Sequence, residues 1–368
     1  MKYVVVVLLV VHGLIHLLGF VKAFDLVQPP QMQATISRPV GLLWLVAALL
    51  LMTSAGALAL RAPWWWLPAA SGVVLSQILI VGAWSDAKAG SIANVVLLLP
   101  MLIAALDVAP WGFRAQYDRE VADRLRHPPQ QVQLLTEADM THLPFVVQRY
   151  LAFTGVVGKP QVWNYRLHFR GALRNGPNDR WMTMTAHQQS FVNPPARLFY
   201  IESSLFGIPF NAFHRYVGPA ATFRVRLASL LTMVDARGAE MNQSETVTLF
   251  NDMCLLAPAT LIDRSIVWEE VDPLTVRATW SNVGNTISAV LSFDSSGALV
   301  NFVSDDRYRT IDGKTYQRLR WSTPVMEWRE FDGRKLPAVA EATWQLPEGE
   351  FAYARSEILE VAYNVADY

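Results

Sequence analysis

The sequence predicts a four-helix transmembrane region followed by an α+β domain built on an antiparallel β meander. Two observations predict this order. Apolar residues are concentrated before residue 110 of the 368-residue chain, and after residue 161 short segments alternate apolar and polar residues between turn sequences. We therefore expect a transmembrane region at 1–110, a linker at 111–135 and a soluble β-rich domain at 136–368.

Four segments of the first region contain no aspartate, glutamate, lysine or arginine. At 1.5 Å rise per residue, each is long enough to cross a hydrocarbon core of about 30 Å. Tryptophans lie near the ends of the third and fourth segments, as is typical of side chains at the membrane–water interface. The predicted spans are residues 3–21, 39–60, 62–85 and 89–106.

The predicted location is the cell (inner) membrane. No small-residue cleavage site follows the first span, so we expect it to be retained. Four spans place both termini on one side, and the lysines and arginines favour a cytoplasmic location for that side. The N-terminal side has Lys2, Arg61, Arg114, Arg119, Arg124 and Arg126, and the other side has Lys22, Arg38 and Lys88.

Two histidines lie inside the first apolar segment. His12 and His16 are one helical turn apart, so they share a helix face. The first span ends on the side where the third ends and the fourth begins, which places Asp86 and Asn94 near the level of His16, and Gln77 lies deeper in the third span. We predict an intramembrane polar cluster of these five residues.

Three interpretations of this cluster compete. Polar side chains hydrogen-bond between spans and fix helix packing. Alternatively, the cluster is a ligand, quinone or proton site in which Asp86 is the partner of His16. The third interpretation is haem or metal ligation by His12 and His16, although a metal usually needs further ligands and only Asp86 offers itself. We therefore predict no cofactor and keep a haem or metal at the paired histidines as an alternative.

The linker is polar and is broken at 127–131 (HPPQQ). A short amphipathic helix is expected within 136–155, with Thr136 as its N-cap and Gly155 as its stop signal. From residue 161 the regular strands and polar turns indicate an antiparallel meander, forming a curved sheet or half-barrel with one or two packed helices.

One helix is expected to interrupt the strands, at 244–256. Ser244 is suited to its N-cap, and Glu245 would meet the positive end of that helix. Arg307 lies in the charged segment SDDRYR, which is expected to be a solvent-exposed strand end. His168 and His187 lie in adjacent predicted strands and would face each other across the ladder.

The predicted strands contain many large aromatic residues. They are typical of a normal sheet core, but a concave sheet can also hold an apolar ligand on its inner face. The candidate ligand-lining residues are Trp163, Phe169, Phe199, Trp268, Trp280 and Trp328.

Two resemblances add to this interpretation. The segments LPFVVQRYLAFTGVVGKPQ, WEEVDPLTVRATW, ISAVLSFDSSGALVNFVSDDRY and WQLPEGEFAYARSEI resemble an uncharacterised bacterial family of unknown function, over about residues 140–364. Many of its members have N-terminal membrane helices. More loosely, the arrangement of strands around one inserted helix is similar to the lipoprotein-carrier (Lol) superfamily. That resemblance implies a half-barrel that holds acyl chains, although those carriers are periplasmic.

Common catalytic motifs are absent from the sequence, which has no G-x-S-x-G, H-E-x-x-H, P-loop or G-x-G-x-x-G. The single cysteine, Cys254, excludes an internal disulfide. A net charge of zero gives no sign of a nucleic-acid partner. These observations favour binding over catalysis.

The leading hypothesis is a membrane-anchored protein whose β domain binds a lipid or other apolar molecule. The alternative is a redox or transport membrane protein with its chemistry at His12, His16 and Asp86. A third hypothesis is a structural or sensory module whose sheet binds a partner protein. The sequence does not define an oligomeric state.

Overall fold

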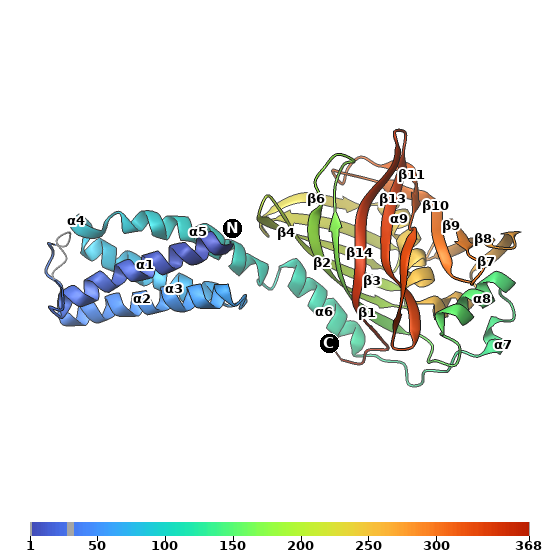
Figure 1. Ribbon diagram of the computed structural model, residues 1–368, viewed down its shortest axis with the longest axis horizontal. Helices are drawn as coiled ribbons and strands as arrows, with labels where there is room; N and C mark the ends of the chain where they lie inside the picture. The colour runs from blue at the N-terminus through green and yellow to red at the C-terminus, as the bar shows by residue number, and fades with distance from the viewer. Residues whose placement is uncertain (1, 28–32, 368) are drawn as a thin grey trace. The chain divides into compact units, whose positions relative to one another are not determined.

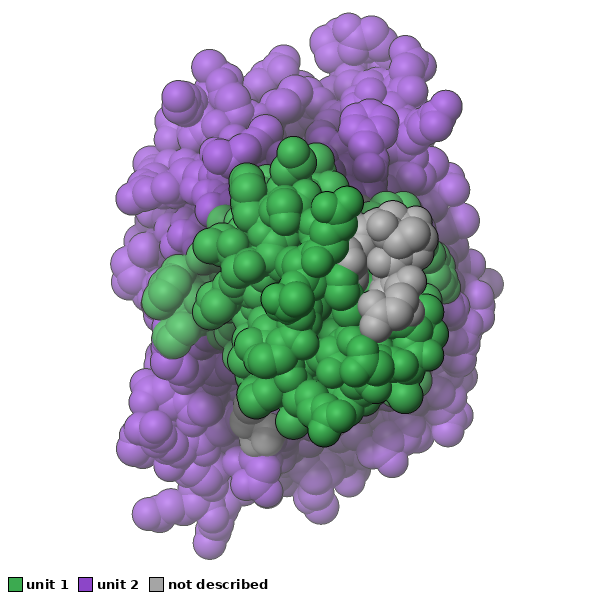
Figure 2. Space-filling model, turned by 90° about the vertical axis from the view of Figure 1, so that its left-hand side faces the viewer, with its two compact units in different colours: residues 1–112 green, residues 113–368 purple. Residues whose placement is uncertain are grey.

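The computed structural model describes residues 2–27 and 33–367. The chain forms two compact units, residues 1–112 and residues 113–368, which Figure 2 shows in different colours. The first unit is helical and the second contains all the strands that the structure describes. Helical and β-rich parts therefore follow each other in the order that the sequence predicts.

The first unit is built from apolar helices joined by short turns. Its elements are α1 (Lys2–Ala23), α2 (Arg38–Ala59), α3 (Trp66–Gly82), α4 (Trp84–Ala87) and α5 (Gly90–Asp107). Three of them, α1, α2 and α5, are long and apolar enough to cross a membrane. The helix α3 is apolar but has only 17 residues, so the third predicted span, 62–85, stays a prediction.

The third predicted span, 62–85, differs most from the structure. Residues 62–65 form a turn, and α3 begins only at Trp66. It ends at Gly82 because the backbone of Ala83 leaves the helical region, with φ −122° and ψ 39°. The short helix α4 then contains Asp86.

Small residues allow α1 and α2 to pack closely. A Cβ atom on Gly19 would lie 2.3 Å from the Trp44 ring, and one on Gly41 would lie 2.2 Å from the Cβ of Ala23. Neither site has room for a side chain. Close backbone approach through small residues is typical of helix association in a membrane, where dispersion contacts replace the hydrophobic effect.

The second unit contains a 14-stranded antiparallel sheet that is not closed (Figure 1). The strands β1 to β6 form one meander, and β7 to β14 form another in which β12 pairs with β13 beside the main path. The two meanders join where β1 pairs with β14, which leaves β6 and β7 as the ends of the sheet. The strands are β1 (Asn164–Leu173), β2 (Met182–Phe191), β3 (Ala196–Leu205), β4 (Ile208–Val217), β5 (Ala220–Leu227), β6 (Leu231–Arg237), β7 (Val267–Asp272), β8 (Thr275–Asn282), β9 (Asn285–Phe293), β10 (Leu299–Arg309), β11 (Gln317–Ser322), β12 (Val325–Phe331), β13 (Arg334–Leu346) and β14 (Gly349–Tyr363).

Helices cover both faces of this sheet. The helix α9 (Ala239–Leu255) packs on β5 and β6 near one end of the sheet and on β8, β9 and β10 near its other end. On the opposite face α6 (Phe113–Leu125) packs on β3 and β4, where Tyr117 lies against Tyr200 and Phe213. The remaining helices are α7 (Glu137–Met140), α8 (Phe145–Thr154) and a 3₁₀ helix at Pro258–Ile262.

The helix predicted within 136–155 is divided into two. Thr136 donates its backbone N–H to Asp139 at 2.8 Å, as expected of a capping box, but α7 ends at Met140. The break falls at Leu143 and Pro144, because a residue that precedes a proline is disfavoured in the helical region. The second helix, α8, begins directly after Pro144. Gly155 ends α8 with φ +69°, as predicted.

The helix α9, predicted at 244–256, is also longer than predicted. It begins at Ala239, directly after Gly238, and not at Ser244. The Ser244 hydroxyl is therefore not an N-cap; it accepts a hydrogen bond from the backbone N–H of Tyr308 in β10, at 2.8 Å. Glu245 therefore lies about two turns inside the helix and not at its end, and its side chain is buried in the domain.

Candidate functional site

The helix α9 places two carboxylates inside the second unit. Glu245 and Asp252 are seven residues apart, two helical turns, and so project from the same side of α9. The Glu245 side chain is fully buried and that of Asp252 is nearly so. An isolated buried carboxylate is very costly, so both need partners.

Arg197 of β3 contacts both carboxylates. Its Nε donates to Asp252 Oδ2 at 2.6 Å, and its Nη1 lies 3.5 Å from Glu245 Oε2. Gln188 of β2 donates a second hydrogen bond to Asp252 Oδ2, at 2.7 Å. The paired strands β2 and β3 therefore supply the donors that bind Asp252.

Strands β4 and β10 supply the other half. His214 Nε2 lies 2.9 Å from Glu245 Oε1, and Arg307 Nη2 lies 3.8 Å from the same oxygen. Thr248, one turn along α9, donates its hydroxyl to that oxygen at 3.0 Å. We call Arg197, His214, Glu245, Asp252 and Arg307 the ionic cluster.

Burial and charge act in opposite directions on the two carboxyl groups. Burial alone would raise the pKa of Glu245, but His214, Arg197 and Arg307 together outweigh it and lower the pKa to about 2. Burial raises the pKa of Asp252 more than Arg197 lowers it. Burial also lowers the pKa of His214, which favours the neutral imidazole. The cluster thus holds Glu245 as an anion between two guanidinium groups.

Each of the two arginines lies over an aromatic ring. The Arg197 guanidinium lies 4.6 Å from the centroid of Phe199, and that of Arg307 lies 4.1 Å from Trp321. Tyr353 accepts hydrogen bonds from Arg307 Nη1 at 2.9 Å and from the Trp321 indole at 3.2 Å. Ring faces favour a desolvated cation, so the rings offset part of the cost of burying these charges.

Some polar atoms of the cluster form no hydrogen bond, although Arg197 Nη1 and Glu245 Oε2 face each other as an ion pair at 3.5 Å. Among the residues that the structure describes, Arg197 Nη1, Glu245 Oε2 and Arg307 Nε are buried and form no hydrogen bond. Such atoms are uncommon in native proteins and usually mark a bound water or ligand group. These atoms could form hydrogen bonds with a polar group of a ligand. None of the five residues of the cluster is an exposed nucleophile.

Beyond the cluster the same face of the sheet becomes apolar. Arg197 pairs with Tyr216, whose hydroxyl contacts Thr246 of α9 at 2.7 Å, so these side chains face the helix. Side chains two positions along a strand lie on the same face. Phe199 and His214 therefore share the α9 face.

The strand register extends this apolar area. His214 pairs with Phe223 of β5, and their rings lie 4.8 Å apart. In the next row, Val225 pairs with Val234 of β6. The side chains of Phe199, Phe223, Val225 and Val234 are only partly buried, and we call these four residues the apolar strip.

The predicted ligand-lining aromatic residues do not all meet. Phe169 of β1 and Phe199 of β3 are in edge-to-face contact at 5.9 Å, across β2, where the small Ala186 pairs with Phe169. This pair borders the apolar strip. It is the part of the predicted set that the structure brings together on the α9 face.

The other four predicted residues, all tryptophans, do not join this pair. Trp163 precedes β1 and joins the apolar cluster under α6. Trp280 is stacked on Phe250 of α9 at 5.7 Å. Trp328 of β12 packs against α8, and Trp268 of β7 is a partly buried member of the main core.

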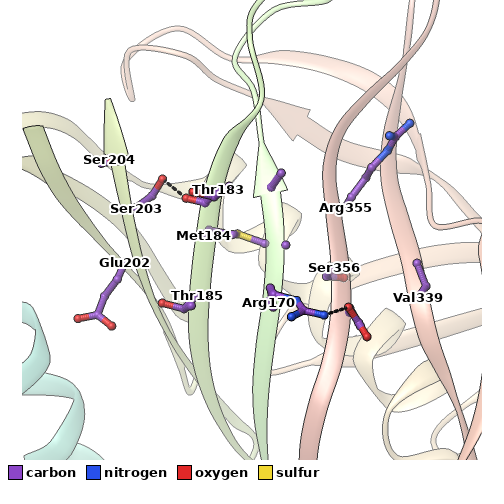
Figure 3. A pocket seen from close by; sticks show the side chains of 13 residues that line it. Arg170, Thr183, Met184, Thr185, Glu202, Ser203, Ser204, Val339, Arg355 and Ser356 are labelled. Carbon is purple, nitrogen blue, oxygen red and sulfur yellow. Dashed lines mark hydrogen bonds and ion pairs between the residues drawn. The ribbon is translucent and has the colours of Figure 1, made fainter. Parts of the chain in front are cut away.

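A shallow open hollow of about 720 Å³ lies over β1, β2, β3, β13 and β14 (Figure 3). Charged and small polar residues are most of its lining, but the surface that they present to it is mainly apolar, and Arg170 donates to Glu357 at 2.7 Å. None of the six predicted aromatic residues, all of which the structure describes, is among its lining residues. The hollow is therefore distinct from the predicted apolar site.

The first unit contains a neutral polar network. His12 Nε2 contacts Asn94 Oδ1 at 2.8 Å and Ser76 Oγ at 3.2 Å, which joins α1, α5 and α3. Asn94 Nδ2 donates to Gln77 Oε1 at 3.0 Å, and Gln77 Nε2 donates to Ser91 Oγ at 3.0 Å. Three of the five predicted cluster residues, His12, Gln77 and Asn94, belong to this network.

His16 and Asp86 are placed differently. His16 Nδ1 contacts the His12 carbonyl oxygen at 2.9 Å, and its ring lies 5.1 Å from Trp44. Its Nε2 is buried and forms no hydrogen bond with any residue that the structure describes. Asp86 accepts hydrogen bonds from the backbone N–H groups of Gln33 and Ala34, each at 2.7 Å, which lower its pKa. The carboxylate thus binds the loop before α2, and not His16 as predicted.

His168 and His187 face each other in β1 and β2, and their rings are in contact through Nε2 and Nδ1. Glu360 of β14 lies 3.6 Å from His168 Nδ1. Burial, with His168 and Arg114 nearby, lowers the pKa of His187 to about 4. No group of three metal-ligating side chains that could hold an ion is present in residues 2–27 and 33–367.

Sequence reasoning missed most of the ionic cluster. Glu245 was expected at a helix end and Arg307 at a solvated strand end, yet both are buried. Arg197 and Asp252 were not singled out. A signal exists: Arg197 interrupts the apolar run ARLFYI, and a charge inside such a run needs an internal partner.

Comparisons with known proteins agree with the suspected resemblance. A family model described as "Family of unknown function (DUF6544)" matches residues 133–356, more than half of the chain. No curated protein sequence matches the chain. A crystal structure of a DUF1329 family protein from Desulfovibrio piger ATCC 29098 is similar at 12% identity, covering 60% of this chain and 91% of that chain. Its TM-score is 0.35, too low to support an argument about this protein.

Proposed function

The chain belongs to the DUF6544 family, a family of unknown function, and on that premise we propose that its β domain is a membrane-anchored binding module for a lipid or other apolar molecule. The apolar helices α1, α2 and α5 would insert into the cell membrane and tether the domain. The bilayer would then supply the ligand directly.

One observation supports this proposal above the others: the apolar strip continues the α9 face directly beside the ionic cluster. Phe199 belongs to the strip and also lies under the Arg197 guanidinium. A molecule with an apolar body and a polar end fits such a surface, because its body would cover the strip. Its polar end would supply a hydrogen bond to Arg197 Nη1 or Glu245 Oε2, which form an ion pair with each other but no hydrogen bond.

The test is native mass spectrometry of the full-length protein released gently from membranes. We expect a retained lipid-sized mass, and we expect Val225→Glu to remove it by placing a charge on the strip. Thr222→Glu is the matched control, since it lies three positions away in β5 on the opposite face and is also partly buried. Retention of the mass in both variants would contradict the proposal.

A second function has its own supporting observation. The network from His12 through Asn94 and Gln77 to Ser91 is continuous inside a helical bundle, and His16 Nε2 is left unpartnered. This favours a redox or transport role centred on the two histidines. A retained cofactor with visible absorbance, lost in His12→Ala or His16→Ala, is the expected result. A featureless spectrum with unchanged ligand content in both variants would exclude it.

A further inference from the structure

Two hairpin tips of the second unit expose large apolar side chains side by side. The turn between β3 and β4 and the turn between β5 and β6 are joined by a hydrogen bond from the Ala228 N–H to the Pro209 oxygen, at 2.7 Å. Phe206 is 92% exposed and Leu231 is 62% exposed. We call the following six exposed residues the tip patch: Leu205, Phe206, Ile208, Leu230, Leu231 and Met233.

The tip patch lies near the point where the chain enters the second unit. Phe113, the first residue of α6, lies under two guanidinium groups of β5, at 4.4 Å from Arg226 and 4.8 Å from Arg224. Arg226 is followed by Leu227, which pairs with both Phe210 and Leu231 at the bases of the two tips. The first turn of α6 is therefore fixed close to the tip patch.

The tether to the membrane helices is short. The helix α5 ends at Asp107, and only residues 108–112 separate it from Phe113. Six Cα–Cα steps reach at most about 20 Å. Trp111 lies in this tether, and an indole ring favours the headgroup level. If α5 spans the bilayer, Phe113 and the β5 arginines beside it cannot lie far from the bilayer surface.

We propose that the tip patch binds the surface of the bilayer from which α5 emerges. Exposed apolar side chains on a loop tip are costly in water and gain free energy on entering the headgroup region. Arg224 and Arg226 lie at the base of the patch, where cations attract anionic headgroups. The surface therefore fits an anionic lipid bilayer. This inference needs the membrane insertion of α5, but it does not depend on the ligand of the apolar strip.

The experiment uses the full-length protein in nanodiscs of phosphatidylethanolamine and phosphatidylglycerol. The single natural cysteine, Cys254, is buried, so a fluorophore can be attached to one introduced cysteine at a time. Phe206→Cys and Leu231→Cys report on the tip patch. Headgroup-spin-labelled lipid should quench both strongly, and in nanodiscs without spin label the less polar interface should shift their emission to the blue.

Val283→Cys is the matched control. Val283 is 63% exposed, like Leu231, but it lies in the turn between β8 and β9. That turn contacts Gly218, in the turn that joins β4 to β5 at the ends away from the tips, through Asn282 at 3.2 Å. We expect several-fold weaker quenching there. Equal quenching at Val283 and at the tip positions would overturn the proposal.

Two further results would also overturn it. A patch covered by a second copy of this chain would show no lipid quenching, and pyrene labels at position 206 would give excimer emission. Quenching of Val95→Cys in α5 by acyl-chain spin labels checks membrane insertion separately. If Val95 is quenched and the tips are not, the helix is inserted and the proposal for the tip patch is wrong; if Val95 is not quenched, its premise is wrong.

Discussion

The two units bury polar groups in different chemical forms. The second unit buries ions: Glu245 and Asp252 contact arginines that themselves lie over aromatic rings. The first unit buries neutral groups, and its network joins imidazole, amide and hydroxyl groups without a formal charge. The difference indicates how strongly each unit depends on its buried polar contacts.

The physical reason is the cost of an unpaired group in each case. A buried charge that loses its partner is far more costly than a neutral group that loses one hydrogen bond. In a membrane-like environment, neutral pairs contribute little because the separated helices also find partners. We therefore expect the ionic cluster to dominate stability and the neutral network to act mainly on helix placement.

The largest effect is expected for Arg197→Ala. This change leaves two buried carboxylates without their shared cation, which should destabilise the second unit by about 3–5 kcal/mol. Hydrogen exchange of α9 amides in the full-length protein measures the change. A loss no larger than that of an exposed ion pair would show that the cluster is not a buried ionic system.

Acidification should also test the ionic cluster, because the lowered pKa of Glu245 predicts that stability falls as the pH falls. The pKa of Glu245 is lowered from 4.5 to about 2, so its contribution to stability is present above pH 4.5 and is lost as pH falls toward 2. Buried His214, whose pKa is also lowered, acts in the same direction below its usual value, because the unfolded chain takes up the proton first. Asp252, with a raised pKa, acts in the opposite direction.

The Glu245→Gln variant separates these contributions. We expect its stability to depend less steeply on pH below 4.5 than that of the unchanged protein, even though the variant is less stable at neutral pH. Near-UV circular dichroism during thermal unfolding, at several pH values, gives the slopes. Identical slopes would mean that Glu245 is not the ionised group that we assign.

A smaller effect is expected for Asn94→Ala in the first unit. It removes the contacts with His12 and Gln77 and should cost about 1 kcal/mol, as is typical between membrane helices. Thermal unfolding in detergent measures it, with Ser71→Ala as control because Ser71 bonds only within α3 among the contacts that the structure describes. A loss as large as that of Arg197→Ala would remove the contrast between the units.

The smallest effect is expected for Arg170→Ala, at the edge of the hollow in Figure 3. Its ion pair with Glu357 is short, at 2.7 Å, but the Arg170 side chain is mostly exposed. Solvent screening should keep the loss of stability smaller than that of Asn94→Ala and reduce it further in salt. A larger, salt-independent loss would indicate a buried role for this pair.

Local patterns predicted much of the fold because local forces determine it. The turn DSSG at 294–297 is an example: Asp294 accepts the N–H of Ser296 at 2.8 Å, and Gly297 has φ +92°. Alternation likewise predicted some strands of each meander, such as β2 and β9. The apolar runs predicted α1, α2 and α5, since length and composition alone fit them to a bilayer.

The candidate site was less predictable because its partners are distant in the chain. Arg197 and Glu245 are 48 residues apart, and Arg307 is a further 62 residues away. Asp86 illustrates the same limit in the first unit, where helix geometry placed it near His16 but a loop segment provided its actual partners. Sequence spacing identifies groups that can meet, whereas packing selects those that do.

The sequence by itself determined the division into an apolar helical part and a β-rich part, together with the turns and the family, because composition and short-range periodicity encode these. Only the tertiary structure decided that β1 pairs with β14 and that α9 packs on one face of the sheet with its carboxylates buried. Such choices depend on long-range pairing, in which each buried charge must find its counter-charge. That complementarity has no period along the chain.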